Sequence, residues 1–143
     1  MIGIFIALLS GVLMGVQGVF NTQVTKSTSL WVSASWVQFS ALVICLVAWF
    51  FCDRTSFGGI LTIEPKYMLF GGAIGAFITY TVIKGISALG PAKAVMLIVI
   101  AQLTVAYLIQ LFGLFGAQKA DFEWRRLLGL LICAGGIVLY QWE

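Results

Sequence analysis

The chain has 143 residues, of which 62% are hydrophobic and 9% are charged, and its formal net charge is +3. A soluble domain averages about 45–50% apolar and about 25% charged residues, so this composition excludes a water-soluble domain. The basic residues form no run that would suit nucleic acid. Because the apolar runs are continuous and do not alternate, the sequence indicates an all-α integral membrane protein.

Five apolar runs are each close to the ~20 residues with which a helix crosses a bilayer. The first run lacks a basic segment before it and a small-residue cleavage site, so it is predicted to be a retained helix and not a signal peptide. Together the runs predict a single transmembrane domain over residues 1–143, with no soluble domain beside it. The predicted spans are residues 2–20, 30–52, 67–89, 91–112 and 127–142.

The boundaries between these spans carry recognisable signals. Polar residues predict a first loop from Asn21 to Leu30, a second from Asp53 to Lys66 and a fourth from Gly116 to Arg126. Gly90-Pro91 predicts a tight turn, because Gly favours a helix end and Pro favours a helix start. Aromatic residues lie near the span ends, as in an interfacial belt. These are Trp31, Tyr67, Trp124, Tyr140 and Trp142.

Five spans place the two ends of the domain on opposite sides of the membrane. Five basic residues then fall on the N-terminal side (Arg54, Lys66, Lys119, Arg125, Arg126) and three on the other (Lys26, Lys84, Lys93). This bias favours a cytoplasmic N-terminus, and it is small enough to permit both orientations. Two copies in tandem would be inverted relative to each other, which is a common architecture of transporters with a midplane site. We therefore expect an antiparallel dimer of five plus five helices.

The first run, "SGVLMGVQGVFN", combines small and polar residues. Gly11, Gly15 and Gly18 form a stripe that would let another helix approach closely. Gln17 and Asn21 lie beside this stripe and are candidate substrate-binding residues. The alternatives are that both amides only bond a neighbouring helix, or that Asn21 is an interfacial cap.

The third run, "GGAIGAFITYTVIKG", contains a second small pair, Gly71 and Gly75. Tyr80 and Lys84 are four residues apart and share a helix face. Side chains lean toward the helix N-terminus, so the stem of Lys84 starts toward the membrane centre, and Tyr80 and Lys84 are candidate substrate-binding residues. The alternative is snorkelling to the interface, which fits Lys93 in the fourth run better than Lys84.

The fourth run, "VIAQLTVAYLIQLFGLFG", carries two amides. Gln102 lies near mid-span, and Gln110 follows about 12 Å along the axis and about 80° around it. They can line one side of a cavity at two depths, or they can join helices to one another. The fifth run has only interfacial polar residues and is interpreted as packing or dimer scaffold.

The composition does not support a catalytic or metal-binding function. The sequence has no His, and every Asp and Glu lies in a predicted loop or at a terminus. Cys45, Cys52 and Cys133 lie in or at the ends of spans without metal-site spacing, and are interpreted as apolar fillers. We expect no metal, no cofactor and no enzymatic activity.

Three segments resemble one family. "GVQGVFNTQ" resembles the pattern Gln-Gly-x-x-Asn that opens the YdcZ-type branch of the drug/metabolite transporter superfamily. "IAQLTVAYLIQLFGLFG" resembles the helix-4 signature of that branch, and "RRLLGLLICAGGIVLY" is similar to the closing helix of the superfamily. Gln17, Asn21 and Gln102 match motif residues, whereas Gln110 stands where the family usually has Asp and Ala101 replaces the usual Gly.

The resemblance implies a multi-pass protein of the bacterial inner membrane that transports or exports small molecules. Members occur as single five-helix chains, paired genes or fused ten-helix forms with antiparallel halves, so a second copy or a paired homologue is the expected partner. The related small multidrug resistance proteins exchange protons for cations through a membrane-embedded Glu. No span here contains an acid, which favours a neutral, zwitterionic or anionic solute.

The sequence thus predicts a small-molecule exporter that works by alternating access as an antiparallel dimer. A half-transporter that requires a sister chain, a non-transporting membrane subunit and a channel remain as alternatives.

Overall fold

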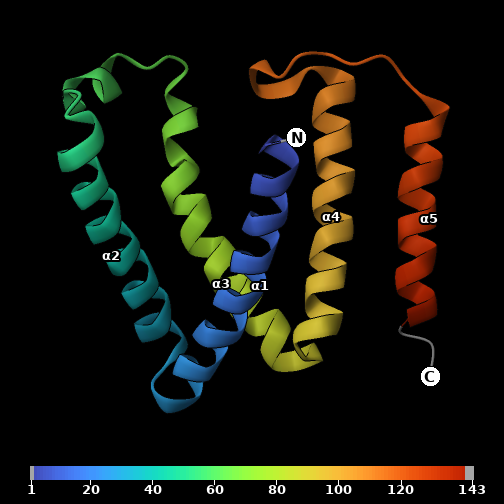
Figure 1. Cartoon of the computed structure of the whole chain (residues 1–143), viewed down its shortest axis with the longest axis horizontal. Coiled ribbons are helices and arrows are strands. Elements are labelled where there is room, and N and C mark those ends of the chain that lie inside the picture. The colour runs from blue at the N-terminus through green and yellow to red at the C-terminus, as the bar shows by residue number, and fades with distance from the viewer. Residues whose placement is uncertain (1, 141–143) are drawn as a thin grey trace. The chain divides into compact units, whose positions relative to one another are not determined.

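The computed structural model describes residues 2–140, and over that range the protein is helical and contains no strand (Figure 1). The chain divides into two compact units, Met1–Ala88 and Leu89–Glu143, which are described separately. The prediction of an all-α protein is confirmed. The last two residues of the predicted fifth span, including Trp142, lie outside the described residues. The helices are α1 (Ile2–Ser27), α2 (Leu30–Ala48), α3 (Gly71–Leu89), α4 (Pro91–Phe112) and α5 (Trp124–Tyr140).

Short helical turns complete the two units. α2 continues into a π-helical turn, η1 (Trp49–Asp53), and α3 is preceded by a 3₁₀ turn, η3 (Lys66–Phe70). Another 3₁₀ turn, η2 (Phe57–Thr62), lies in the loop between α2 and α3, and η4 (Leu114–Gly116) follows α4.

Four helical segments are long and apolar enough to cross a membrane, which supports a membrane-embedded protein. They are Ile2–Ser27, Leu30–Cys52, Lys66–Leu89 and Pro91–Phe112. The described part of α5 has 17 residues, or about 26 Å, which is somewhat shorter than the others. The fifth span therefore remains a prediction.

The first loop is much shorter than predicted, because α1 does not end before Asn21 but continues to Ser27. The polar residues of this segment remain helical because their hydroxyls bond carbonyls one turn earlier. Thr22 Oγ1 donates to Gly18 O at 2.8 Å, and Thr25 Oγ1 donates to Asn21 O at 2.8 Å. After a two-residue turn, the Ser29 hydroxyl caps α2 by accepting from the Val32 amide at 3.3 Å.

The ends of α4 follow the glycine and proline signals. Gly90 has φ 79° and Pro91 is the first helical residue, which confirms the predicted tight turn. Gly113 ends the helix in the left-handed region at φ 62°. The following loop folds back on the helix, since the Ala120 amide donates to Gln110 O at 2.9 Å. α5 then begins at Trp124, earlier than the predicted start at residue 127.

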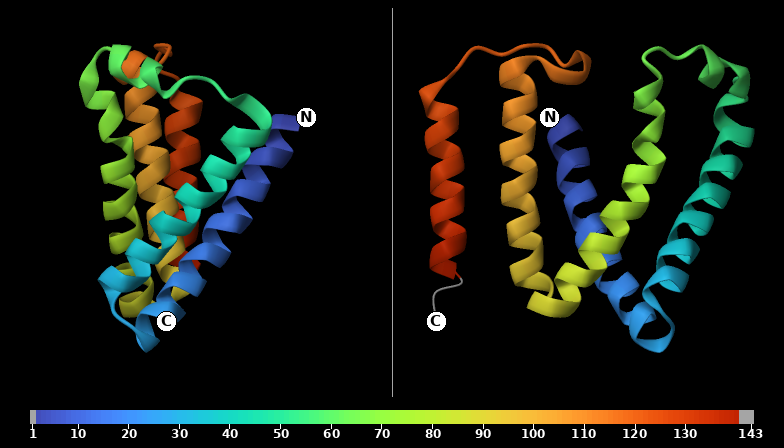
Figure 2. Two further views of the ribbon diagram at one scale, coloured as in Figure 1. Left: turned by 90° about the vertical axis from the view of Figure 1, so that its left-hand side faces the viewer. Right: turned by 180° about the vertical axis from the view of Figure 1, so that it is seen from behind.

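The core of the first unit lies toward one end of its helices. α1 and α2 form an antiparallel hairpin, and the Ser33 hydroxyl of α2 donates to Asn21 O of α1 at 3.0 Å (Figure 2). α1 approaches α3 at Gly18, where an added Cβ would lie 2.8 Å from Ile86 Cδ1. The buried residues of this unit are Gly18, Thr22, Ser33, Ala34, Ile83 and Ile86.

Most large apolar side chains lie outside this core. Phe5, Phe39 and Ile74, one from each helix of the first unit, are 71%, 57% and 57% exposed. A soluble protein would not leave such side chains in water, whereas a bilayer or another chain covers them favourably.

Candidate functional site

An aromatic pair joins α2 and α3 in the first unit. The rings of Trp31 and Tyr80 lie 5.1 Å apart with an interplanar angle of 30°. Tyr80 is half-buried, whereas Lys84, one turn further along α3, is exposed. The pair therefore forms a platform next to a cationic side chain, since residues four apart share a helix face.

Gln38 of α2 is a polar residue that the sequence interpretation missed. An added Cβ at Gly75 of α3 would lie 3.7 Å from Gln38 Nε2, so this amide lies against α3. Gln38 is half-buried and has no hydrogen-bond partner among the described residues of its unit. Its spacing from Trp31 and Ser35 places all three on one face of α2, a signal that was available in the sequence.

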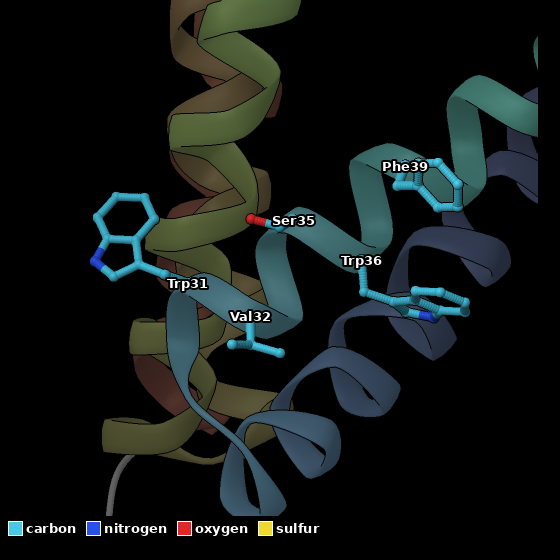
Figure 3. Close-up of a pocket in the computed structure, with 5 residues that line it drawn as sticks. All are labelled: Trp31, Val32, Ser35, Trp36 and Phe39. Carbon is cyan, nitrogen blue, oxygen red and sulfur yellow. The ribbon is translucent and has the colours of Figure 1, made fainter.

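An open apolar hollow of about 460 Å³ lies along α2 (Figure 3). Figure 3 shows Trp36 and Phe39 extending to one side of the helix, and Trp31 to the other. The polar groups of its lining residues are the Ser35 hydroxyl and the indole N–H groups of Trp31 and Trp36, and none of these residues is charged. The hollow is therefore mainly apolar, which fits contact with lipid.

Gln17 and Asn21 both lie within α1. The interpretation of Asn21 as an interfacial cap is wrong, because the helix continues to Ser27. The backbone carbonyl of Asn21 accepts bonds from the hydroxyls of Thr25 and Ser33, whereas its half-buried side-chain amide has no described partner in this unit. Gln17 is exposed next to Gly18, the contact between α1 and α3.

The glycines predicted to pack helices occupy two kinds of environment. Gly18 meets Ile86 and Gly75 faces Gln38. An added Cβ at Gly11, Gly15 or Gly71 would meet nothing within 4 Å. A packing role for these three glycines stays a prediction that requires a neighbour from outside the first unit.

The second unit contains a groove of about 410 Å³ between α4 and α5. Gln110 lines this groove, whereas Gln102 is exposed and is not among its lining residues, so the two amides do not share it. The Tyr107 hydroxyl is buried and has no hydrogen-bond partner among the described residues. The lining residues are Leu103, Ala106, Tyr107, Gln110, Arg126, Gly129, Leu130 and Cys133.

Tyr107 and Arg126 were both missed as site residues. Tyr107 is an aromatic residue within a long apolar run, and Arg126 was assigned to the fourth loop. Only the early start of α5 brings Arg126 onto the helix that faces Gln110.

The predicted site residues thus fall into two groups. Gln17, Asn21, Tyr80 and Lys84 belong to the first unit, and Gln102 and Gln110 to the second. No group of His, Cys, Asp and Glu within residues 2–140 could hold a metal ion. The polar side chains present can donate and accept hydrogen bonds, which suits binding and release of a solute.

Comparison with protein families gives one match. The model of the family described as "Putative inner membrane exporter, YdcZ" matches residues 2–139. The comparisons with curated proteins and with solved structures return no match. Since the family model covers nearly the whole chain, the protein belongs to the YdcZ family of inner membrane exporters, which are membrane transporters and not enzymes.

Proposed function

We propose that this chain exports a small solute by alternating access as an antiparallel dimer of five-helix copies, with α5 as the fifth span. Solute binds through Gln17, Asn21, Tyr80, Lys84, Gln102 and Gln110. The helices that carry these residues rearrange as access passes from one side of the membrane to the other. No covalent chemistry is required.

The observation that carries the proposal is that apolar helices bear side-chain amides without a hydrogen-bond partner. The side chains of Gln17, Gln102 and Gln110 have no hydrogen-bond partner among the described residues of their own units. Lipid offers none in the hydrocarbon region, so a polar group there needs a hydrated cavity, a ligand or another chain. A solute pathway between two copies supplies all three.

The exposed apolar surface supports a second copy. The α1–α2 hairpin and the small core of the first unit cannot by themselves enclose a sealed pathway. An inverted partner would bring a second set of helices, and inverted pairs are a recurrent architecture of transporters. The YdcZ family description as an exporter supports the direction of transport.

The charges within the spans support a neutral, zwitterionic or anionic solute. None of the four membrane-length helical segments contains Asp or Glu. Lys84 shares a face of α3 with Tyr80, one turn along the helix from the Trp31–Tyr80 pair. Its ammonium group attracts a carboxylate and repels a cation, and the two rings offer apolar surface to a solute that contains a ring.

A matched series of ligands tests the proposed solute class. Benzoate, phenylalanine, benzamide and benzylammonium share one ring and differ in charge, and each is added to the detergent-purified protein in a thermal-shift experiment. A ligand at 100 times its Kd stabilises the native state by about 2.7 kcal/mol, which raises the melting temperature by several degrees. We expect a rise with benzoate and none with benzylammonium.

Two lysine variants test whether benzoate acts at Lys84. Lys84→Met should abolish the rise with benzoate, and Lys93→Met, the same change at a residue expected to snorkel, should retain it. A rise with benzylammonium alone, or an equal benzoate effect in both variants, would contradict the proposed site.

Cysteine labelling in intact cells tests the antiparallel arrangement. Ser27→Cys and Gln118→Cys are made separately in a chain whose three native cysteines are Ser, and a membrane-impermeant maleimide is added. Two opposed orientations should leave each cysteine labelled in about half of the molecules, and fully labelled after permeabilisation. Complete labelling of one variant and none of the other would instead favour a sister chain as the partner.

A further inference from the structure

We propose that the groove between α4 and α5 is a binding site for one acidic phospholipid of the surrounding bilayer. Its phosphate lies at Arg126 and Gln110, and one acyl chain lies along the apolar floor. This site lies within the second unit and shares Gln110 with the proposed solute pathway, so the variants that test it are made at Arg126 and Gly129, which the solute proposal does not use.

The groove is polar at one end and apolar at the other. Gln110 and Leu103 of α4 are seven residues apart, as are Arg126 and Cys133 of α5, so the groove extends about 10 Å along each helix. Figure 2 shows α4 and α5 side by side and antiparallel. The order of the lining residues along the two helices therefore places Arg126 near the level of Gln110 and Cys133 near the level of Leu103.

Small residues create the space between these ends. Ala106 and Gly129 occupy the middle of the groove, and an added Cβ at Gly129 would meet nothing within 4 Å. Leu103, Leu130 and Cys133 line the deeper part and offer hydrocarbon and sulfur surface. This part accommodates a methylene chain and has no polar group for a hydrophilic solute.

The polar end has hydrogen-bond donors and one positive charge. Arg126 is the charged residue among the lining residues of the groove. Its Nε and Nη2 each bond a Glu123 carboxylate oxygen at 3.2 Å, which fixes the guanidinium plane and leaves Nη1 for a ligand. Glu123 pairs with Arg126 from outside the groove, so within the groove Arg126 offers mainly its Nη1 donors. A phosphodiester oxygen can accept from Nη1 and from the Gln110 side-chain amide.

The unpartnered Tyr107 hydroxyl indicates the same ligand. A buried hydroxyl without a hydrogen bond is unfavourable, which suggests that a bound molecule satisfies it. Tyr107 is three residues before Gln110, or about 4.5 Å deeper along α4. In a phospholipid the ester carbonyls lie at that depth below the phosphate, and a carbonyl oxygen accepts from a phenolic O–H.

The position along the helices favours a lipid over a soluble phosphate. Gln110 lies near the end of the membrane-length α4, and Arg126 lies in the first turn of α5. The polar end of the groove is thus close to the membrane interface, and the apolar floor extends toward the hydrocarbon. A phospholipid at the interface has this orientation before it binds.

Alkylation of Cys133 reports whether the groove is occupied. The protein with Cys45→Ser and Cys52→Ser is reconstituted in phosphatidylcholine vesicles with and without phosphatidylglycerol, and the rate of reaction with N-ethylmaleimide is measured. We expect a several-fold slower reaction when phosphatidylglycerol is present, because its acyl chain covers the Cys133 thiol.

Matched variants identify the groups that bind. Arg126→Gln should abolish the protection, whereas Arg125→Gln, which removes the same charge next to the groove, should retain it. Glu123→Gln should retain protection, since it removes only the ion pair. Gly129→Leu should slow the reaction equally in both lipids, and Gly135→Leu, on another face of α5, should leave the lipid dependence unchanged.

Native mass spectrometry of the detergent-solubilised protein provides a second measurement. We expect one retained phosphatidylglycerol per chain, lost in Arg126→Gln and kept in Arg125→Gln. Equal alkylation rates in the two vesicle types would overturn the proposal. Equal loss in both arginine variants would also overturn it, because it would show attraction to surface charge in general. Equal protection by free glycerol phosphate would reassign the groove to a soluble solute.

Discussion

Small residues have opposite effects in the two units of this protein. In the first unit, the Ile86 side chain of α3 reaches Gly18 of α1, so that an added Cβ would be 2.8 Å from Ile86 Cδ1. In the second unit, Gly129 of α5 faces open space between two adjacent helices. A glycine in an apolar helix can therefore either bring a neighbour close or leave room for a ligand. The sequence looks the same in both cases, and only the rotation of each helix distinguishes them.

The largest expected effect is at Gly18, where a substitution tests most directly whether this glycine is in contact with a neighbouring helix. Gly18→Leu should destabilise the protein by about 1–3 kcal/mol, because the added side chain must displace Ile86 from a packed contact. Thermal unfolding in detergent, followed by tryptophan fluorescence, measures the change. Gly3→Leu, where an added Cβ meets nothing within 4 Å, is the control. Adding Ile86→Ala to Gly18→Leu should restore part of the loss, and equal stability of the two leucine variants would refute the close contact.

A glycine-to-leucine substitution in the second unit should have the opposite effect on stability. Gly129→Leu should raise stability by up to about 1 kcal/mol, since leucine has the higher helix propensity and no neighbour must move. The same unfolding measurement applies, with Gly135→Leu as the control for propensity alone. A loss like that expected at Gly18 would show that α4 and α5 pack without a groove.

The smallest expected effect concerns the buried hydroxyl between α1 and α2. Ser33→Ala should cost about 0.6 kcal/mol, the typical value for a hydrogen bond between membrane helices, because Asn21 O loses a donor. Ser35→Ala, two residues away and exposed, should have no measurable effect. If both variants unfold at the temperature of the unaltered protein, the bond to Asn21 does not stabilise the hairpin.

The sequence predicted the helical class, the bounds of α4 and the Gly90-Pro91 turn because strong local signals determine them. It failed at the end of α1 because Thr22 and Thr25 resemble loop residues, yet their hydroxyls bond carbonyls of the same helix. A polar side chain that bonds its own helix leaves no trace in composition or hydropathy.

The candidate site was less accessible to sequence reasoning than the fold. Gln38 could have been found, because it is a side-chain amide near the middle of a predicted span. Tyr107 could not, since its significance lies in a hydroxyl without a partner, which depends on how α5 faces α4. Whether Gln17 and Gln102 bind solute stays a prediction, and the Lys84→Met variant above tests the same prediction for Lys84.

The length of α1 has a consequence for the bilayer around the protein. Its 26 residues extend about 39 Å, whereas the hydrocarbon layer is ~30 Å thick. A helix that exceeds the layer tilts or projects from it, and either response changes with bilayer thickness. Lys26 lies in the last turn of α1, so thickness sets how far its ammonium group reaches among the lipid phosphates. The α1–α2 hairpin is thus coupled to the thickness of the membrane in which the protein resides.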